Sequence, residues 1–262
     1  MIHRLKYLTC LTAMSFAYHA NADPVPVRHV EGFIHGYVVL RDANDALLAA
    51  GDVTQLPSGN RVTTTLSLHF KDGSIYEETS VFSQQHVFKL LAYKQVMKGP
   101  AFPKPQTTTI DTATGNVTIL TTDKDGKAKT IAKQLSLPPD LANGIASMLL
   151  TDVDPKVETV LSMLVGSEPR LVKLKISAVG EDPFSIGGSG FKATHYVIKI
   201  DLGPVTGTVA KVIGKQPPPT NIWVAAGAAP IFLKSEGQLF EDGPIWRIEL
   251  ASPSWPKAPL TK

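Results

Sequence analysis

The sequence has little cysteine, little net charge and no long apolar run, and each shortage excludes a class of protein. Its 262 residues include a single cysteine, Cys10, which excludes a disulfide framework and any multi-cysteine metal site. The formal net charge of +3 is too small to indicate a nucleic-acid surface. No stretch of the sequence reaches the ~18 consecutive apolar residues of a membrane-spanning helix. The 43% of hydrophobic residues still suffice for a sizeable core.

The first 22 residues have the composition of an export signal. Arg4 and Lys6 precede an apolar stretch from Tyr7 to Ala17, and Ala20-Asn21-Ala22 places small residues at positions −3 and −1 of a cleavage site. The apolar stretch is about half the ~20 residues that a membrane anchor needs. We therefore expect cleavage after Ala22 and a periplasmic or secreted product.

Removal of this segment changes the composition of the working protein. Taking 22 residues from 262 leaves 240, and the loss of Arg4 and Lys6 lowers the net charge from +3 to +1. Cys10 is lost as well, so the mature chain, residues 23–262, has no thiol to oxidise outside the cytoplasm.

Most of the mature chain alternates apolar and polar residues with a period of two, which is typical of strands with one buried face. Between Val62 and Phe70, for example, the even-numbered positions are mainly apolar and the odd-numbered ones polar. We expect fourteen strands: Gly32–Arg41, Leu47–Leu56, Arg61–Phe70, Ile75–Ser83, Val87–Met97, Thr107–Asp111, Val117–Thr122, Lys127–Leu135, Arg170–Val179, Phe191–Leu202, Gly207–Gly214, Asn221–Ala226, Ile231–Glu236 and Pro244–Ala251.

Turn signals separate these stretches and determine how they pair. Asp72-Gly73 and Asp125-Gly126 are strong hairpin signals, and strands joined by tight turns must be antiparallel neighbours. The sequence therefore predicts a mainly β fold, a large antiparallel meander curled into a barrel or half-barrel with a short helical insert. We expect one β-rich domain over residues 23–262, with a first meander at 27–135, a helical insert at 136–166, a second meander at 167–252 and a tail at 253–262.

The helical insert is predicted from a change of period. After Pro138-Pro139, Leu141, Ile145, Met148 and Leu149 recur at helical spacing. Asp154-Pro155 then resembles an N-cap followed by proline at the first helical position, with an apolar stripe of Val157, Val160, Leu161 and Leu164. Two such helices would bury their stripes on the sheet, either as a lid over the core or as a plug in a ligand cavity.

No motif for catalysis, a metal or a cofactor stands out. The histidines of the mature chain lack metal-ligand spacing, and Gly187-Gly188-Ser189-Gly190 is not a nucleophile elbow. Glu77 and Glu78 are adjacent in a strand and must point to opposite faces, so they cannot form an acid–base pair. We accordingly predict no catalytic residues, no metal and no cofactor.

The tryptophans cluster near the C-terminus and provide further candidates for a cavity lining. Trp246 shares strand parity with Ile248 and Leu250 and is predicted to face the core. Trp223 is predicted on the opposite face of its strand from Ile222 and Val224, so it is expected either in a cavity or on the outer face. The residues predicted to line a ligand cavity are Leu141, Ile145, Met148, Leu149, Trp223 and Trp246.

These features together resemble uncharacterised bacterial envelope proteins with a LolA-like fold, that of the lipoprotein carriers. The resemblance rests on the meanders on either side of Leu137-Pro138-Pro139, on the stretches Thr194–Lys199 and Ile222-Trp223-Val224 leading into Ala229-Pro230-Ile231, and on Gly243–Leu250. It implies a curved sheet wrapped around helices, with an apolar concavity that holds acyl chains in the carriers. Leu141, Ile145, Met148 and Leu149 would then line or plug that concavity.

The leading hypothesis for function is an exported, non-enzymatic protein that binds an apolar or amphipathic, lipid-like ligand in its curved sheet. One alternative is an envelope scaffold that pairs with a protein partner through an exposed strand edge. Another is an enzyme whose site is assembled from separate strands, with His69, Glu77, Glu78 and His195 as candidates. No nucleic acid and no transmembrane segment is expected.

Overall fold

The computed structural model describes residues 24–123, 125–202, 217–225, 227 and 230–251, and its main feature is a continuous antiparallel sheet of fourteen strands. The first eight strands are β1 (Ile34–Arg41), β2 (Leu47–Ser58), β3 (Arg61–Phe70), β4 (Ile75–Gln85), β5 (Val87–Lys98), β6 (Gln106–Asp111), β7 (Asn116–Thr122) and β8 (Ala128–Gln134). The expected export signal, the expected strand Gly207–Gly214 and the expected tail lie outside the described residues.

The other six strands follow a connecting segment that contains the single helix of the described residues, α1 (Ala146–Leu149). These strands are β9 (Thr159–Val165), β10 (Arg170–Ile186), β11 (Ser189–Asp201), β12 (Thr220–Ala225), β13 (Ile231–Gln238) and β14 (Ile245–Leu250).

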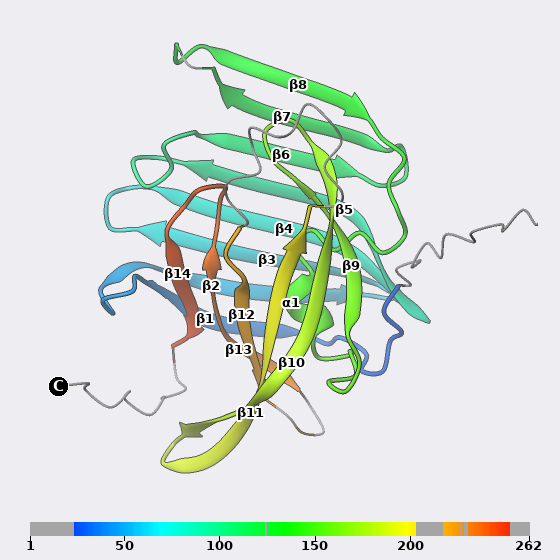
Figure 1. The fold of residues 1–262 in the computed structure, drawn as a ribbon, viewed down its shortest axis with the longest axis vertical. Coiled ribbons are helices and arrows are strands. Elements are labelled where there is room, and N and C mark those ends of the chain that lie inside the picture. The colour runs from blue at the N-terminus through cyan, green and yellow to red at the C-terminus, as the bar shows by residue number, and fades with distance from the viewer. Residues whose placement is uncertain (1–23, 124, 203–216, 226, 228–229, 252–262) are drawn as a thin grey trace, which may run out of the picture.

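The order of the strands shows how the two halves of the chain meet. Strands β1 to β8 form one meander and β9 to β14 form another, and antiparallel pairing of β1 with β14 joins them into one sheet. In Figure 1, β3 to β8 run across the back while β9 to β14 stand in front of them, so the sheet curls and turns one face inward. This arrangement confirms the predicted mainly β, antiparallel and curled fold.

Alternation along each strand decides which side chains reach that inner face. In β4, Tyr76, Ser80 and Phe82 are buried, whereas Glu77 between them is exposed. The inner-face side chains of neighbouring strands stand beside one another, as Leu68 does beside Tyr76. Because the period is two, residues two apart on a strand share a face.

The space between the two layers is filled by the segment that connects them. Leu141, Ile145, Leu149 and Leu150 are almost fully buried, and they belong to the same apolar cluster as inner-face residues of both meanders. We call residues 141–153 the plug. The plug is mostly turns and loops around the four-residue helix α1.

The prediction of a second helix is wrong. The chain opened by Asp154 and Pro155 enters β9, whose whole length pairs with β10. Its other edge is covered by the start of the plug, because Ala142 N donates to Ser162 O at 2.8 Å and Ser162 N donates to Asp140 O at 3.2 Å. The apolar spacing fitted a one-sided helix, but a strand with partners on both edges satisfies more backbone groups. The second meander therefore begins at Thr159, within the expected insert.

The two ends of the sheet approach each other through side chains. Lys129 and Lys133 on β8 each place Nζ 3.3 Å from a carboxylate oxygen of Glu168, in the turn between β9 and β10. The segment of residues 24–32 is bound to the plug. Asp152 Oδ1 accepts from the backbone N–H of Arg28 at 2.6 Å and from that of His29 at 2.7 Å.

Truncation of a plug residue should destabilise the whole protein. Ile145→Ala removes a fully buried side chain between the two layers and is expected to lower the free energy of unfolding by about 2–5 kcal/mol. Urea unfolding followed by circular dichroism measures this change. Ile245→Ala, the same substitution at a half-exposed position, is the matched control and should cost under about 1 kcal/mol. Equal losses at the two positions would contradict the role given to the plug.

Candidate functional site

A row of side chains across the inner face changes from apolar to polar in the middle of the first meander. Cross-strand pairing places Val53, Leu66, Glu78, Gln95 and Thr108 side by side, one from each of β2 to β6. Thr108 is buried, while the other four are half-buried although they face the interior. The interior is therefore packed less tightly along this row than at the plug.

Glu78 is the centre of the row and is held by two tyrosines. Its Oε2 accepts from the Tyr76 hydroxyl at 2.7 Å and from the Tyr93 hydroxyl at 3.1 Å. Gln95 Nε2 donates to the Tyr76 hydroxyl at 3.1 Å. Both tyrosines therefore donate to the same carboxylate oxygen. We call Tyr76, Glu78, Tyr93 and Gln95 the Glu78 cluster.

Burial sets the protonation of this cluster. It raises the pKa of Glu78, although hydrogen bonds from Tyr76, Tyr93 and Gln95 favour the carboxylate and oppose the shift. Burial, with the nearby Glu78 carboxylate, also raises the pKa values of Tyr76 and Tyr93 well above the usual value for a phenol. The tyrosines therefore remain protonated donors at neutral pH, and Glu78 is the group of the cluster that titrates.

The Glu78 cluster lies between two apolar regions. On one side is the plug: a Cβ at Gly144, whose φ is +70°, would lie 2.1 Å from Ser80 Oγ and 2.7 Å from Tyr93 Cε2. On the other side Tyr76 joins an aromatic group in which the Phe102 ring lies 5.3 Å from that of Phe70 and 6.3 Å from that of Trp246. This arrangement offers a hydrogen-bonding carboxylate in apolar surroundings, suited to the polar end of a mainly apolar molecule.

The predicted cavity residues do not form one site. Leu141, Ile145 and Leu149 lie in the plug core, and the half-buried Met148 packs against it. Trp246 belongs to the aromatic group on the far side of the Glu78 cluster. Trp223 lies in a third, separate cluster.

Trp223 is surrounded by polar partners from neighbouring strands. Its Nε1 donates to Asp182 Oδ2 at 2.6 Å, its ring stacks on His195 at 4.3 Å, and Lys234 Nζ lies 3.9 Å from the ring centroid. His195 Nε2 also lies 2.9 Å from Asn221 Oδ1. His195 is half-buried, and its contacts account for it as a packing residue.

The four residues considered for an enzyme also remain apart. Glu77 is exposed and Glu78 is inside, as strand alternation requires. His69 is exposed beside Ser67, and His195 lies with Trp223 on β11 and β12. No shared site assembles from them.

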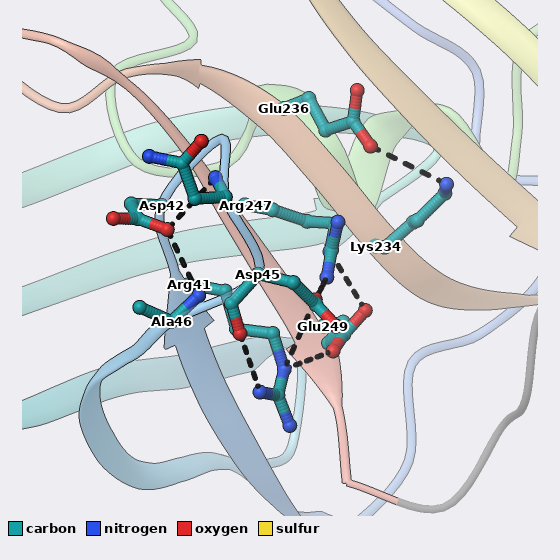
Figure 2. Close-up of polar contacts among 9 residues, drawn as sticks. Arg41, Asp42, Asp45, Ala46, Lys234, Glu236, Arg247 and Glu249 are labelled. Atoms are coloured by element: carbon teal, nitrogen blue, oxygen red, sulfur yellow. Dashed lines mark hydrogen bonds and ion pairs between the residues drawn. The ribbon is translucent and has the colours of Figure 1, made fainter. Parts of the chain in front are cut away.

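A second polar network joins β1 and β14, the first and last strands along the described chain, as Figure 2 shows. Glu249 accepts from Arg41 Nε and from Arg247 Nε, both at 2.9 Å, and Arg247 also pairs with Asp45. Opposite charges pair among the side chains drawn there, including Lys234 with Glu236 at 3.4 Å. Asp42 instead accepts from the backbone N–H groups of Asn44 and Ala46, both at 2.9 Å. This network reinforces the β1–β14 junction.

A serine–lysine contact lies at the β9 edge. Ser162 Oγ lies 2.7 Å from Asp140 Oδ2, to which it donates, and Lys173 Nζ lies 2.9 Å from Ser162 Oγ. Ser162 is only 1% exposed, and Lys173 is committed to Asp140 at 3.4 Å. A buried hydroxyl without a free base is not an activated nucleophile, so these residues anchor the plug to β9.

The sequence interpretation noticed Glu78 but missed its partners. Tyr76 could have been found, because it is two residues from Glu78 on one strand and must share its face. Tyr93 and Gln95 could not, because their place beside β4 depends on hairpin register and on an irregularity of pairing between Val81 and Phe82.

Two further features are absent from the described part of the chain. It holds no group of three histidine, cysteine or carboxylate side chains placed to bind a metal ion. No helix in it has the length and apolar character needed to span a membrane.

Comparison with known proteins assigns no family to this chain. No protein family and no curated protein matches the sequence. Among solved structures, the chain is similar to a β-barrel-like protein of a domain of unknown function, DUF1849, from Brucella abortus, at 9% identity and a TM-score of 0.44. The match covers 87% of this chain and 100% of that one. No comparison identifies a LolA-like family, so that resemblance stays a prediction.

The raised pKa of Glu78 predicts a specific pH dependence of stability. Between the unfolded pKa near 4.5 and the higher folded pKa, the unfolded chain releases a proton that the folded protein keeps, so this group destabilises the fold as pH rises. Glu78→Gln removes this contribution. The free energy of unfolding of the variant minus that of the wild type should therefore increase from pH 4 towards neutral pH and then level off.

Urea unfolding at a series of pH values measures this difference. Glu77→Gln, on the exposed face of the same strand, is the matched control and should keep the wild-type profile. A difference between Glu78→Gln and wild type that does not change with pH would contradict the assigned shift.

Proposed function

We propose that the protein is an exported, non-enzymatic binding protein for an amphipathic small molecule, held on the inner face of the first meander with its polar end at Glu78. The observation that carries this proposal is the Glu78 carboxylate itself. It is on the inner face, two tyrosines donate to its Oε2, and no lysine or arginine occupies an inward position of β2 to β6. Burying a carboxylate costs free energy, and a role in ligand binding accounts for its presence there.

The rest of the row supports an amphipathic ligand over a purely apolar one. Val53 and Leu66 provide a half-buried apolar surface on one side of Glu78, and Gln95 and Thr108 provide polar groups on the other. The plug occupies the region where a carrier would hold a long acyl chain, because Leu141, Ile145 and Leu149 are packed against both layers. A small ligand beside the plug fits this arrangement better than a chain that fills the whole concavity.

The absence of an enzymatic role is part of the proposal. General acid–base catalysis needs groups poised to exchange protons near neutral pH. The raised pKa values of Tyr76 and Tyr93 keep both hydroxyls protonated, which leaves Glu78 as the one titrating member of its cluster.

Export rests on the N-terminal sequence, and N-terminal sequencing of the protein from its host tests cleavage after Ala22.

A bulky residue beside Glu78 should block binding. Leu66→Trp enlarges the half-buried neighbour of Glu78 on β3 and is expected to abolish retention of amphiphiles that co-purify with the protein or are added to it. Native mass spectrometry of protein from its own host measures retention. Leu120→Trp, at a half-exposed position on β7, is the control and should retain the ligand. Wild-type protein that retains no amphiphile would contradict the proposal.

A second candidate function, an envelope scaffold, is favoured by the unequal edges of the sheet. The β9 edge is capped by the plug, where Asn143 exchanges two side-chain hydrogen bonds of 2.9 Å with the backbone of Leu164. The outer edge of β8 pairs with no strand of the described residues. An uncovered edge can accept a strand from a partner.

Proline substitution separates the two edges of β8. Successive N–H groups of a strand point in opposite directions, so of Lys129→Pro and Thr130→Pro one removes a backbone bond to β7 and the other removes an outward backbone donor. If β8 binds a partner, the variant that keeps wild-type stability should lose the partner in pull-downs from native extract. Retention of the partner by both variants would exclude the β8 edge.

A further inference from the structure

The inner face of β2 to β6 carries a single charged side chain. All of these strands lie within the described residues, and every other inward position on them is neutral. The groups that act on the pKa of Glu78 through hydrogen bonds, Tyr76, Tyr93 and Gln95, are neutral as well. The site therefore presents one negative charge without a lysine or arginine on the same face of these strands.

The two tyrosine donors beside Glu78 are already used. Tyr76 and Tyr93 each have one hydroxyl proton, and both protons go to Glu78 Oε2. Since Tyr76 donates to Glu78, it must accept from Gln95, which directs the amide nitrogen of Gln95 to it. One row further along, Gln106 Nε2 donates to Thr108 Oγ1 at 2.9 Å.

Acceptor oxygens lie in this part of the inner face beside the charge of Glu78. Glu78 Oε1, Gln95 Oε1 and Gln106 Oε1 belong to neighbouring strands, β4, β5 and β6. A positively charged donor would bond to such oxygens and offset the charge of Glu78. A carboxylate or phosphate end would meet the like charge of Glu78, with no lysine or arginine on the same face of β2 to β6.

We propose that the polar end of the ligand is a primary ammonium group, donating to Glu78 Oε1 and to the amide oxygens of Gln95 and Gln106, with the apolar part of the molecule lying over Leu66 and Val53. This inference rests on the proposed binding function and specifies the class of ligand. An ammonium group combines a positive charge with three donors.

Four amphiphiles with the same twelve-carbon chain test the head group on the wild-type protein. Dodecylammonium, dodecanol, dodecanoate and dodecyltrimethylammonium are titrated separately below their micelle concentrations, with affinity measured by calorimetry. Dodecylammonium should bind about 10- to 100-fold more tightly than dodecanol, the range expected for a charge-assisted hydrogen bond. Dodecyltrimethylammonium, which is charged but lacks N–H donors, should bind less tightly than dodecylammonium, and dodecanoate the least tightly.

Variants then assign the preference to Glu78. Glu78→Gln should lose most of the preference for dodecylammonium while still binding dodecanol, and Glu77→Gln, exposed on the opposite face, should keep the preference. Circular dichroism tests whether each variant is folded. If Glu78→Gln does not fold, the four wild-type titrations by themselves test the ammonium head group.

The outcomes separate the two proposals. Equal or tighter binding of dodecanol, dodecanoate or dodecyltrimethylammonium would overturn the ammonium assignment and leave the binding function standing, as would an unchanged preference in folded Glu78→Gln. Failure of all four amphiphiles to bind the wild type would overturn both.

Discussion

Burial of the plug between the two halves of the sheet is the contact on which the rest of the structure depends. The apolar inner face of a sheet of fourteen strands must be buried. Leu141, Ile145 and Leu149 pack against this face in both layers of the curled sheet. The same segment caps the edge strand β9 through Ala142 and Asn143. The plug therefore stabilises the core and protects one open edge of the sheet.

The inner face is apolar on either side of Glu78, whose burial costs free energy. Glu78 is placed between the plug and the aromatic group around Phe102, where burial disfavours its charge and raises its pKa. Tyr76 and Tyr93 offset part of that cost by donating to one carboxylate oxygen. Other charged clusters, such as that of Arg41, Arg247 and Glu249 in Figure 2, are internally paired and hold strands together. Glu78 differs from them because no described cation accompanies it.

The predictability of each part follows the range of the interactions that decide it. The strand Arg61–Phe70 was predictable because the alternation of apolar and polar residues and the Asp-Gly turn are local signals. Both predicted ends of this strand agree with the structure. The chain around Leu161 and Leu164 was assigned to a helix because its apolar spacing suits either structure. Its strand conformation is decided by β10 and by the plug, which lie on its two edges. Propensity over a few residues carries no information about such partners.

By itself, the sequence determined the class of the fold, the antiparallel pairing and the fact that Glu77 and Glu78 face opposite ways, because each follows from a period of two and from short turns. Only the tertiary structure decided that Glu78 is the inward one and that Tyr93 and Gln95 stand beside it. It also placed Trp223 and Trp246 in different clusters and filled the concavity with the plug. The physical reason is that register and curvature come from contacts between residues far apart in the chain, which no local pattern records.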